Sequence, residues 1–265
     1  MEALINAGGK GSRMGRCGIE KPMQPVGGVP TVKRVVDALS ACSRIDRILV
    51  SVSDNTLDTE AYLDSIGVET IRTSGESFMD DLHTAFESMG GEYVLTCPSD
   101  LPLLTTEAVD EFLDFFRPGE MQSAIAVVDE ETVRSVGITP SYTREDGGRR
   151  WVLSGICIMS REGTLRGDYL EEALFKTGRV DLSVNVNTRS ELFLARGMLG
   201  DSSQAPMGHD RADRSRRRRP AAAVMPSPSP RASSWRHWRS MLWPSSQGLR
   251  ALSGRKGTLS TRTRS

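Results

Sequence analysis

The chain has few cysteines and no long apolar segment, and these absences exclude several classes of protein. Only four cysteines occur among 265 residues (Cys17, Cys42, Cys97 and Cys157), and no two of them form a CxxC pair. A zinc site or a disulfide framework is therefore not indicated, and scattered cysteines suit a reducing compartment. No apolar run approaches the length of a membrane span. No basic stretch followed by an apolar core stands near the N-terminus. We expect a cytoplasmic protein with no secretory signal and no membrane contact.

Charge and composition divide the chain into two segments. Residues 1–200 carry 20 Lys and Arg against 31 Asp and Glu, whereas residues 201–265 carry 14 Lys and Arg against three Asp. The first segment has ample apolar residues for a core. The second includes a stretch rich in Arg, Ser and Pro at 214–234 and has no periodic apolar face. We therefore predict a folded domain over 1–199 and a disordered tail over 200–265.

The arginine-rich tail has more than one interpretation. A basic arm that binds nucleic acid is one. A non-functional extension, or a stretch read in the wrong frame, is another, and we favour this second kind. The tail lacks Glu, Ile, Phe, Tyr, Asn and Cys altogether. The acidic domain that precedes it also disfavours nucleic acid as a partner, so we expect none.

Short apolar runs alternate with amphipathic stretches throughout the first 200 residues. Strands are expected at 2–7, 47–53, 68–73, 92–97, 123–128 and 151–160, and helices at 30–41, 59–67, 77–91 and 106–116. Residues 129–150 are polar and are expected to form an inserted loop or hairpin. Residues 184–199 begin extended and enter a helix through a capping box of Thr188 and Glu191. The alternation predicts an α/β fold, a Rossmann-like three-layer sandwich with a mostly parallel mixed sheet.

A glycine-rich segment with interleaved cations, "AGGKGSRMG" at residues 7–15, directly follows the first predicted strand. In such sheets, ligands bind beyond the carboxyl ends of the strands. Glycines let another group approach the main chain, and successive N–H groups form an anion cradle. Lys10, Arg13 and Lys21 would add charge-assisted bonds to phosphates. The segment therefore predicts a phosphate-binding loop and not an ordinary tight turn.

Two known phosphate-binding patterns do not fit this loop. A P-loop requires GxxxxGK[ST], which residues 8–15 do not supply. The dinucleotide fingerprint requires glycine or alanine in its third place, where this chain has Met14. Cations inside the loop suit a triphosphate better than a dinucleotide.

Several residues outside the glycine-rich segment have two interpretations each. Asp100 either holds a divalent cation or caps the following turn. Asn185 and Asn187 flank one valine, so an extended backbone directs both the same way, toward a ligand or into a turn before the helix. Gly155 either permits close approach of a ligand or marks a strand bulge. Cys97 is expected to fill the core and not to act as a nucleophile.

The segment "AGGKGSRMG", followed by "EKP" at 20–22, resembles the signature of a superfamily of nucleotidyltransferases that includes molybdenum-cofactor guanylyltransferase. Within that superfamily, the chain is most similar to the archaeal-type adenosylcobinamide-phosphate guanylyltransferases of cobalamin salvage. The supporting segments are 72–82, 99–101, 154–160 and 184–192.

This resemblance implies transfer of GMP from GTP to adenosylcobinamide phosphate, with release of pyrophosphate and with Mg²⁺ as cofactor. Such a reaction needs positioned cations and N–H donors more than a proton-transfer pair. By resemblance, Arg13 contacts the leaving pyrophosphate, and Lys21 faces the α-phosphate and the incoming group. Asp100 is the third catalytic residue and, with Asn185, a metal ligand.

The resemblance also implies a set of residues that bind the nucleotide. The set is Ala7, Gly8, Gly9, Lys10, Gly11, Ser74, Gly75, Gly155 and Asn187. Within it, Ser74 and Gly75 would read the guanine edge through backbone groups. Asp80 or Asp81 would accept from the base, although Asp80 also fits as a capping partner of Ser77.

Three alternative functions remain open on the sequence. Guanylyl transfer to molybdopterin shares the early motif, although its pattern usually has Asp where this chain has Glu20. Sugar-phosphate nucleotidyl transfer is the second alternative. A non-catalytic module that binds GTP or nucleic acid is the third. A homodimer is a candidate assembly, and the sequence does not determine the oligomeric state.

Overall fold

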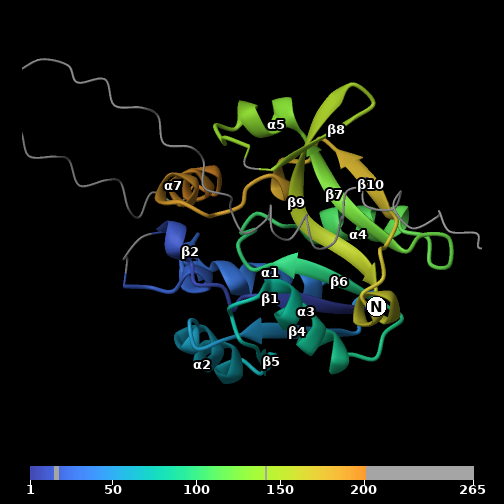
Figure 1. Ribbon diagram of the computed structural model, residues 1–265. Helices are drawn as coiled ribbons and strands as arrows, with labels where there is room; N and C mark the ends of the chain where they lie inside the picture. The colour runs from blue at the N-terminus through green and yellow to red at the C-terminus, as the bar shows by residue number, and fades with distance from the viewer. Residues whose placement is uncertain (15–17, 141, 201–265) are drawn as a thin grey trace, which may run out of the picture. The chain divides into compact units, whose positions relative to one another are not determined.

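The structure, a computed structural model, describes residues 1–14, 18–140 and 142–200 (Figure 1). These residues belong to the first of the two units into which the chain divides, Met1–Val224. Cys17 and the predicted disordered tail after residue 200 lie outside the described residues. Among the helices that the structure describes, none is long and apolar enough to cross a membrane.

One mixed sheet of eight strands organises the described residues. The strand order is β10-β7-β9-β6-β1-β4-β5, and β8 pairs with β9. The strands are β1 (Glu2–Asn6), β4 (Arg47–Val52), β5 (Glu69–Arg72), β6 (Tyr93–Pro98), β7 (Ser123–Asp129), β8 (Thr143–Asp146), β9 (Arg149–Ser160) and β10 (Glu172–Thr177). Strand β1 is parallel to β4 and β6, β4 is parallel to β5, and β7 is parallel to β10. Only β9 runs against its neighbours β6, β7 and β8. The predicted mostly parallel mixed sheet is confirmed.

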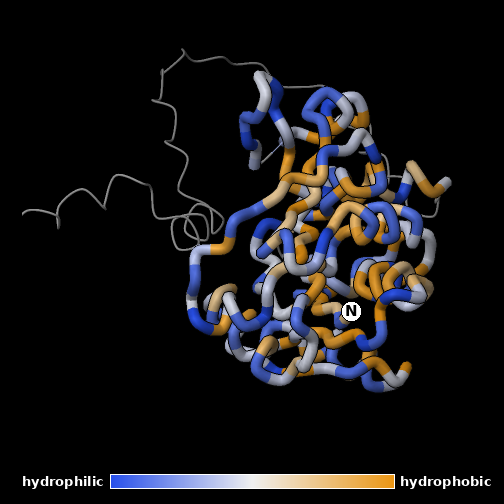
Figure 2. The backbone as a smooth tube through the Cα atoms, turned by 90° about the vertical axis from the view of Figure 1, so that its right-hand side faces the viewer, coloured by the Kyte–Doolittle hydropathy of each residue, from blue (hydrophilic) through white to orange (hydrophobic). Residues whose placement is uncertain are grey.

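Helices cover both faces of this sheet, which gives the predicted three layers. The helices are α1 (Thr31–Ser40), α2 (Leu57–Ser65), α3 (Phe78–Glu87), α4 (Thr106–Phe115), α5 (Glu130–Ser135), α6 (Arg161–Arg166) and α7 (Arg189–Met198). Alternate residues of β1 show the arrangement: Ala3 and Ile5 share one apolar cluster with α1 and α4, and Leu4 shares a second cluster with α3. Figure 2 shows the resulting apolar interior with hydrophilic segments around it.

The sequence did not indicate several of the elements that the structure contains. They are the 3-10 helices η1 (Ser12–Met14), η2 (Lys21–Met23) and η3 (Val180–Leu182), the small hairpin of β2 (Pro25–Val26) and β3 (Val29–Pro30), and α5, α6 and β10. Helix α5 lies inside the expected polar insertion, and its cap is local, since Asp129 accepts from the N–H groups of Glu131 and Thr132. Strands β8 and β9 form the expected hairpin.

Two predicted helices begin in ways that bear on the site. The capping box of Thr188 and Glu191 is present at the start of α7, as predicted. Helix α2 begins at Leu57, two residues before the predicted start at 59. Its first N–H groups are bound by a carboxylate from outside the helix, that of Glu20.

The topology brings several loops to one edge of the sheet. Because β1, β4, β5 and β6 are parallel, the segments that follow them lie at the same edge. Strand β9 runs the opposite way, so its N-terminal half reaches that edge as well. Most of the predicted site residues lie in these segments.

Candidate active site

The glycine loop after β1 is held from one side by the end of β4. Ala7 N donates to Ser51 O at 2.9 Å. The Gly8 carbonyl accepts from Ser53 Oγ at 2.6 Å and from Asn55 Nδ2 at 3.4 Å. Sequence reasoning did not single out Ser53 or Asn55, although Ser53 ends a predicted strand and Asn55 follows it closely.

The glycines in and around this loop differ in the space available to a side chain. Gly75 has φ +66°, and a Cβ there would lie 2.5 Å from Ser53 Oγ, 2.6 Å from Asn55 Nδ2 and 2.8 Å from the Gly8 carbonyl oxygen. A Cβ on Gly11, at φ +57°, would lie 3.1 Å from the Lys21 Cβ. A Cβ on Gly9 would meet no heavy atom within 4 Å. The exposed main chain at Gly9 therefore faces free space, as a ligand-binding loop must.

Lys21, Asp100 and Asn187 come together at the carboxyl edge of the sheet. The Lys21 ammonium forms an ion pair with the Asp100 carboxylate and donates to Asn187 Oδ1 at 3.0 Å. The Lys21 side chain is 18% exposed and the Asp100 side chain is 11% exposed. Two charges so withdrawn from water are stable only when paired. The structure thus unites three predicted site residues from distant parts of the chain.

Asn185 adds a further contact to this group. Its Nδ2 donates to Asp100 Oδ1 at 3.3 Å and to the Ser154 carbonyl at 3.1 Å. The main chain supports the arrangement, since Val186 N donates to Asp100 O at 2.8 Å and Ser99 N donates to Asn6 O at 3.2 Å. We call Lys21, Asp100, Asn185 and Asn187 the lysine–aspartate cluster.

Gly155 lies beside this cluster at an irregularity of β9. Its φ is +89°, and the register between β7 and β9 shifts between Ile125 and Val127. Ser154 Oγ donates to the Ala126 carbonyl at 2.8 Å across this break. The strand-bulge interpretation of Gly155 therefore describes its geometry, and the bulge helps to place the carbonyl that accepts from Asn185.

Asn187 is positioned by the cap of α7. Glu191 Oε2 accepts from the N–H groups of Asn187 and Thr188, each at 2.8 Å. The Thr188 side chain accepts from Glu191 N in return. This reciprocal cap fixes the backbone at Asn187 and leaves its side chain to meet Lys21.

The other two predicted cations differ in their surroundings. Arg13 is exposed in η1, and none of the ion pairs among residues 1–14, 18–140 and 142–200 includes it. Lys10 is exposed and pairs with Glu76 at 2.8 Å. An exposed pair of this kind contributes little stability and is easily exchanged for a phosphate. Both side chains are therefore available to an anionic ligand.

The turn after β5 is shaped by Asp81. Its Oδ1 accepts from Ser74 Oγ at 2.7 Å and from Gly75 N at 3.2 Å. The N–H of Asp80 donates to Ser77 Oγ at 3.3 Å, so the residue takes part in the cap of α3. The Gly75 N–H that was expected to read a base is thus engaged within the turn.

Cys97 lies at the end of β6 and is fully buried. Burial raises the pKa of its thiol well above the ordinary value, and the nearby Asp100 carboxylate adds to this effect. A thiol in this state stays protonated and is a poor nucleophile. Its position agrees with the expected role of core filler.

The donor set at the cluster suits a cation that arrives with its own ligands. Among the residues that the structure describes, no three His, Cys, Asp or Glu side chains gather into a metal-binding group. Asp100 supplies one carboxylate and Asn185 an amide. Mg²⁺ is commonly held by one or two protein carboxylates together with substrate phosphates and water. The cluster fits that pattern.

Comparison with known proteins agrees with this geometry. The MobA-like NTP transferase domain matches residues 3–260. The adenosylcobinamide-phosphate guanylyltransferase of Methanocaldococcus jannaschii is 29% identical over 211 residues, which cover 75% of this chain and 97% of that protein. The molybdenum cofactor guanylyltransferase of Cupriavidus metallidurans is 32% identical over 127 residues, which cover 47% of this chain and 59% of that protein.

Solved structures show the same fold. A hypothetical transferase from Thermus thermophilus matches with a TM-score of 0.56 at 20% identity, over 72% of this chain and 100% of that one. A CMP:2-keto-3-deoxy-manno-octonic acid synthetase complexed with CTP matches with a TM-score of 0.57 at 15% identity, over 75% of this chain and 98% of that one. At these identities the likeness concerns the fold alone.

The packing of the glycine loop gives a prediction. Replacing Gly75 with alanine should lower the free energy of unfolding by about 1–3 kcal/mol. The alanine would be strained at positive φ, and its Cβ would clash with Ser53 Oγ, Asn55 Nδ2 and the Gly8 carbonyl oxygen. Chemical denaturation measures the change. Gly9→Ala is the matched control, and its free energy of unfolding should stay within about 0.5 kcal/mol of the parent, as for substitutions away from strained sites. Equal stability of the two variants would contradict the described packing.

Proposed function

Because the chain belongs to the family of MobA-like NTP transferase domains, we propose that it transfers GMP from GTP to adenosylcobinamide phosphate and releases pyrophosphate. One observation carries the choice of substrates. The match to the adenosylcobinamide-phosphate guanylyltransferase extends over 97% of that protein, whereas the match to the molybdenum cofactor enzyme of Cupriavidus metallidurans stops at 59%.

In the proposed reaction an oxygen of the acceptor phosphate attacks the α-phosphorus of GTP. The bond from the α-phosphorus to its bridging oxygen breaks, and pyrophosphate leaves. Negative charge develops on the phosphoryl oxygens, so positioned cations and N–H groups lower the barrier. We assign these roles to the glycine loop from Ala7 to Gly11, with Lys10 beside the phosphates and Arg13 at the leaving pyrophosphate.

Lys21 takes the position at the α-phosphate in this proposal. In the structure its ammonium is paired with Asp100, so its charge is neutralised. Asp100 and Asn185 would hold Mg²⁺, which supplies positive charge against the triphosphate oxygens. If Asp100 held that cation, the Lys21 ammonium would be free to pair with a phosphate oxygen. In this proposal the contact between Lys21 and Asp100 is exchanged for contacts with the substrate.

The nucleoside has a place beside the same loop. Gly75, in the loop after β5, lies against the Gly8 carbonyl, and Asp81 holds the turn of Ser74 and Gly75. We propose that the guanine lies at this turn, with Gly155 and Asn187 on the other side of the phosphates. The engaged N–H of Gly75 makes the Asp81 carboxylate the better candidate to accept from the base.

A second candidate acceptor is molybdopterin. The molybdenum cofactor guanylyltransferase of Cupriavidus metallidurans is 32% identical over 127 residues, which supports this acceptor as the alternative. The matches to the molybdenum cofactor guanylyltransferases nevertheless cover at most 65% of each relative. We place this activity second, and sugar-phosphate nucleotidyl transfer third.

Pyrophosphate release tests the proposed function directly. Each common nucleoside triphosphate is offered with adenosylcobinamide phosphate, molybdopterin or glucose 1-phosphate, in the presence of Mg²⁺. The highest kcat/KM is expected for GTP with adenosylcobinamide phosphate, and a chelator should abolish the activity until Mg²⁺ is restored. Faster turnover of molybdopterin or of the sugar phosphate would replace the proposed acceptor. No release with any pair would refute the proposal.

The role of Lys21 gives a separate prediction. Lys21→Ala should lower kcat by about 100- to 1,000-fold, the usual cost of losing one preorganised charge at a transition state. Affinity for GTP should change by less than about fivefold, because the glycine loop and the other cations still bind the phosphates. Calorimetry and pyrophosphate release measure the two effects.

Lys33→Ala serves as the control for this experiment. Lys33 pairs with Asp37 on the surface of α1, and its loss should leave kcat within about twofold, since exposed pairs contribute little. Unchanged kcat in the Lys21 variant, with a normal thermal melt, would remove Lys21 from the proposed chemistry.

A further inference from the structure

We propose that Glu20 is a positioning residue: its carboxylate fastens the segment that carries Lys21 to the first turn of α2, and this holds the Lys21 ammonium at Asp100 and Asn187. The inference rests on the function proposed above insofar as Lys21 acts there on the α-phosphate. The contacts that carry it are independent of that function.

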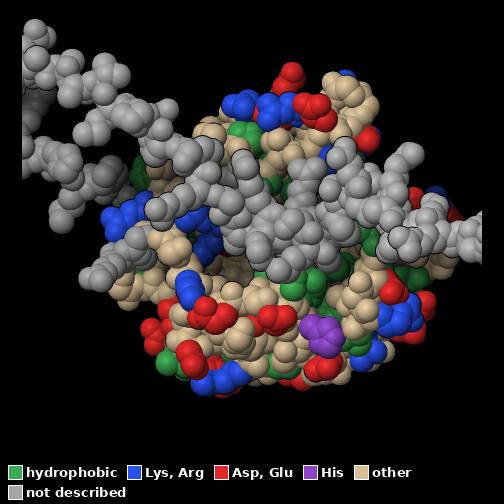
Figure 3. All heavy atoms as spheres, viewed as in Figure 1, with side chains coloured by type: hydrophobic (Ala, Val, Ile, Leu, Met, Phe, Trp, Pro, Cys, Tyr) green, Lys and Arg blue, Asp and Glu red, His purple; other side chains and the backbone are tan. Residues whose placement is uncertain are grey.

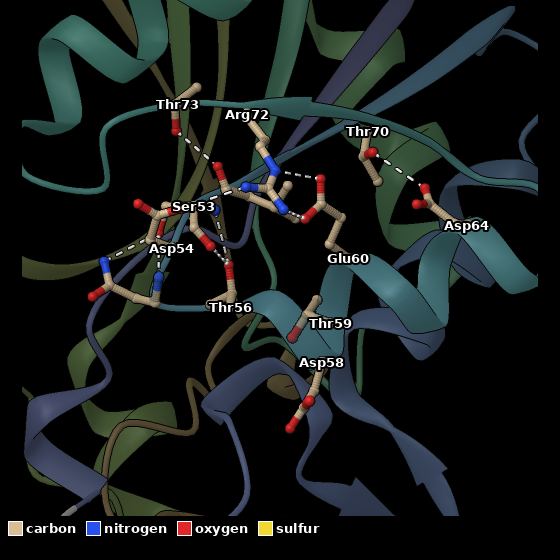
Figure 4. Close-up of polar contacts among 12 residues, drawn as sticks. Ser53, Asp54, Thr56, Asp58, Thr59, Glu60, Asp64, Thr70, Arg72 and Thr73 are labelled. Atoms are coloured by element: carbon tan, nitrogen blue, oxygen red, sulfur yellow. Dashed lines mark hydrogen bonds and ion pairs between the residues drawn. The ribbon is translucent and has the colours of Figure 1, made fainter.

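The start of α2 lacks a cap of its own. Thr56 occupies the cap position but makes no capping hydrogen bond with its side chain. Its hydroxyl instead accepts from Ser53 N at 3.0 Å and donates to Ser53 O at 3.3 Å. Figure 4 shows this turn at the foot of the helix, with Asp58 and Thr59 just beyond it. The first N–H groups of α2 therefore need an acceptor from elsewhere.

Glu20 supplies that acceptor from a distant part of the chain. Its Oε1 accepts from Asp58 N at 2.9 Å, and its Oε2 accepts from Thr59 N at 2.8 Å and from Thr59 Oγ1 at 2.6 Å. Thr59 is fully buried. A carboxylate at a helix N-terminus also interacts favourably with the helix dipole. Three charge-assisted bonds from one side chain make a firm attachment.

The attachment is transmitted to Lys21 because the backbone around it is held on both sides. Gln24 Nε2 donates to the Ile19 carbonyl at 3.0 Å, just before Glu20. Thr31 Oγ1, which is fully buried, donates to the Pro22 carbonyl at 2.8 Å, just after Lys21. With Glu20 fixed to α2 as well, the main chain on both sides of Lys21 is held, and this fixes the point from which its side chain extends to the lysine–aspartate cluster.

The same turn also holds the glycine loop. Ser53 and Asn55 precede α2 directly, and both donate to the Gly8 carbonyl. Glu20 thus ties Lys21 to the structural unit that positions the phosphate-binding loop. A displacement of α2 would move Lys21 and the glycine loop together, whereas loss of Glu20 alone would displace Lys21 relative to the loop.

The test compares Glu20→Ala and Glu20→Gln with a matched control, Glu60→Ala. Glu60 lies on the same first turn of α2 and pairs with Arg72, from β5, at 2.8 Å, on a side of the helix away from Asp58 (Figure 4). Its removal deletes a carboxylate from the same helix but leaves the Lys21 segment untouched. Glu20→Gln keeps the length of the side chain and one acceptor oxygen.

The first readout is the rate at which a small amine-acetylating reagent labels Lys21 in the ligand-free protein, followed by mass spectrometry. Glu20→Ala should raise this rate by about tenfold, because the ammonium leaves its two partners. The second readout is kinetic. The kcat of Glu20→Ala should fall by about 10- to 100-fold, as for a misplaced catalytic group, while the affinity for GTP stays within about threefold. Glu20→Gln should recover part of both effects, and Glu60→Ala should show neither.

Equal labelling of Lys21 in Glu20→Ala and the parent would overturn the proposal, whatever the activity. Equal increases in Glu20→Ala and Glu60→Ala would also overturn it, because they would indicate general loosening of α2. If Glu20→Ala does not fold, Glu20→Gln provides the same comparison. If the parent protein turns over no substrate while the labelling results are as expected, the proposed function fails and the positioning role stands.

Discussion

The ion pair between Lys21 and Asp100 is the interaction on which the site depends. Both side chains are mostly buried. An unpaired charge in such a buried position would destabilise the protein by several kcal/mol. The need to pair them draws together η2, the end of β6 and the segment before α7, which contributes Asn185 and Asn187. A sheet of parallel strands makes this meeting possible, since it delivers the loops to one edge. In the proposed reaction this ion pair would be exchanged, with Lys21 pairing with a phosphate oxygen and Asp100 with a cation.

The charge of the surroundings makes such local cations important. Residues 1–200 carry a net charge of −11, and Figure 3 shows acidic side chains gathered over the region of α2. A triphosphate would be repelled by this general field. Binding must therefore come from a few positioned positive groups and from main-chain N–H groups, and we assign this task to the glycine loop, Lys10, Arg13 and Lys21.

Much of the fold and part of the site could be predicted from local patterns. The alternation of strands and helices, the cap of Ser77 and the capping box of Thr188 and Glu191 are all encoded within a few residues, and all are present. The resemblance grouped Asp100 with Asn185, and the structure places the two side chains in contact at 3.3 Å. The short helices α5 and α6, of six residues each, carry too few periodic residues to stand out.

The contacts that sequence reasoning missed are those made across long stretches of chain. Helix α2 starts at Leu57, and its first N–H groups are bound by Glu20, which stands 38 residues before Asp58. A short sequence window around the start of the helix does not include this acceptor. Ser53 and Asn55 were overlooked for the same reason, since their partner is the Gly8 carbonyl. Gly75 has no unusual neighbours in sequence, and its need for glycine arises from the approach of the Gly8 loop, which lies far earlier in the chain.

A crystal structure of the protein with Mg²⁺ and a non-hydrolysable GTP analogue would show whether the Lys21–Asp100 pair gives way to substrate. We expect the triphosphate to lie along the loop from Ala7 to Gly11, the Lys21 ammonium to have moved from Asp100 to an α-phosphate oxygen, and Asp100 to face the metal. A nucleotide bound elsewhere, with the Lys21–Asp100 pair intact, would refute the exchange.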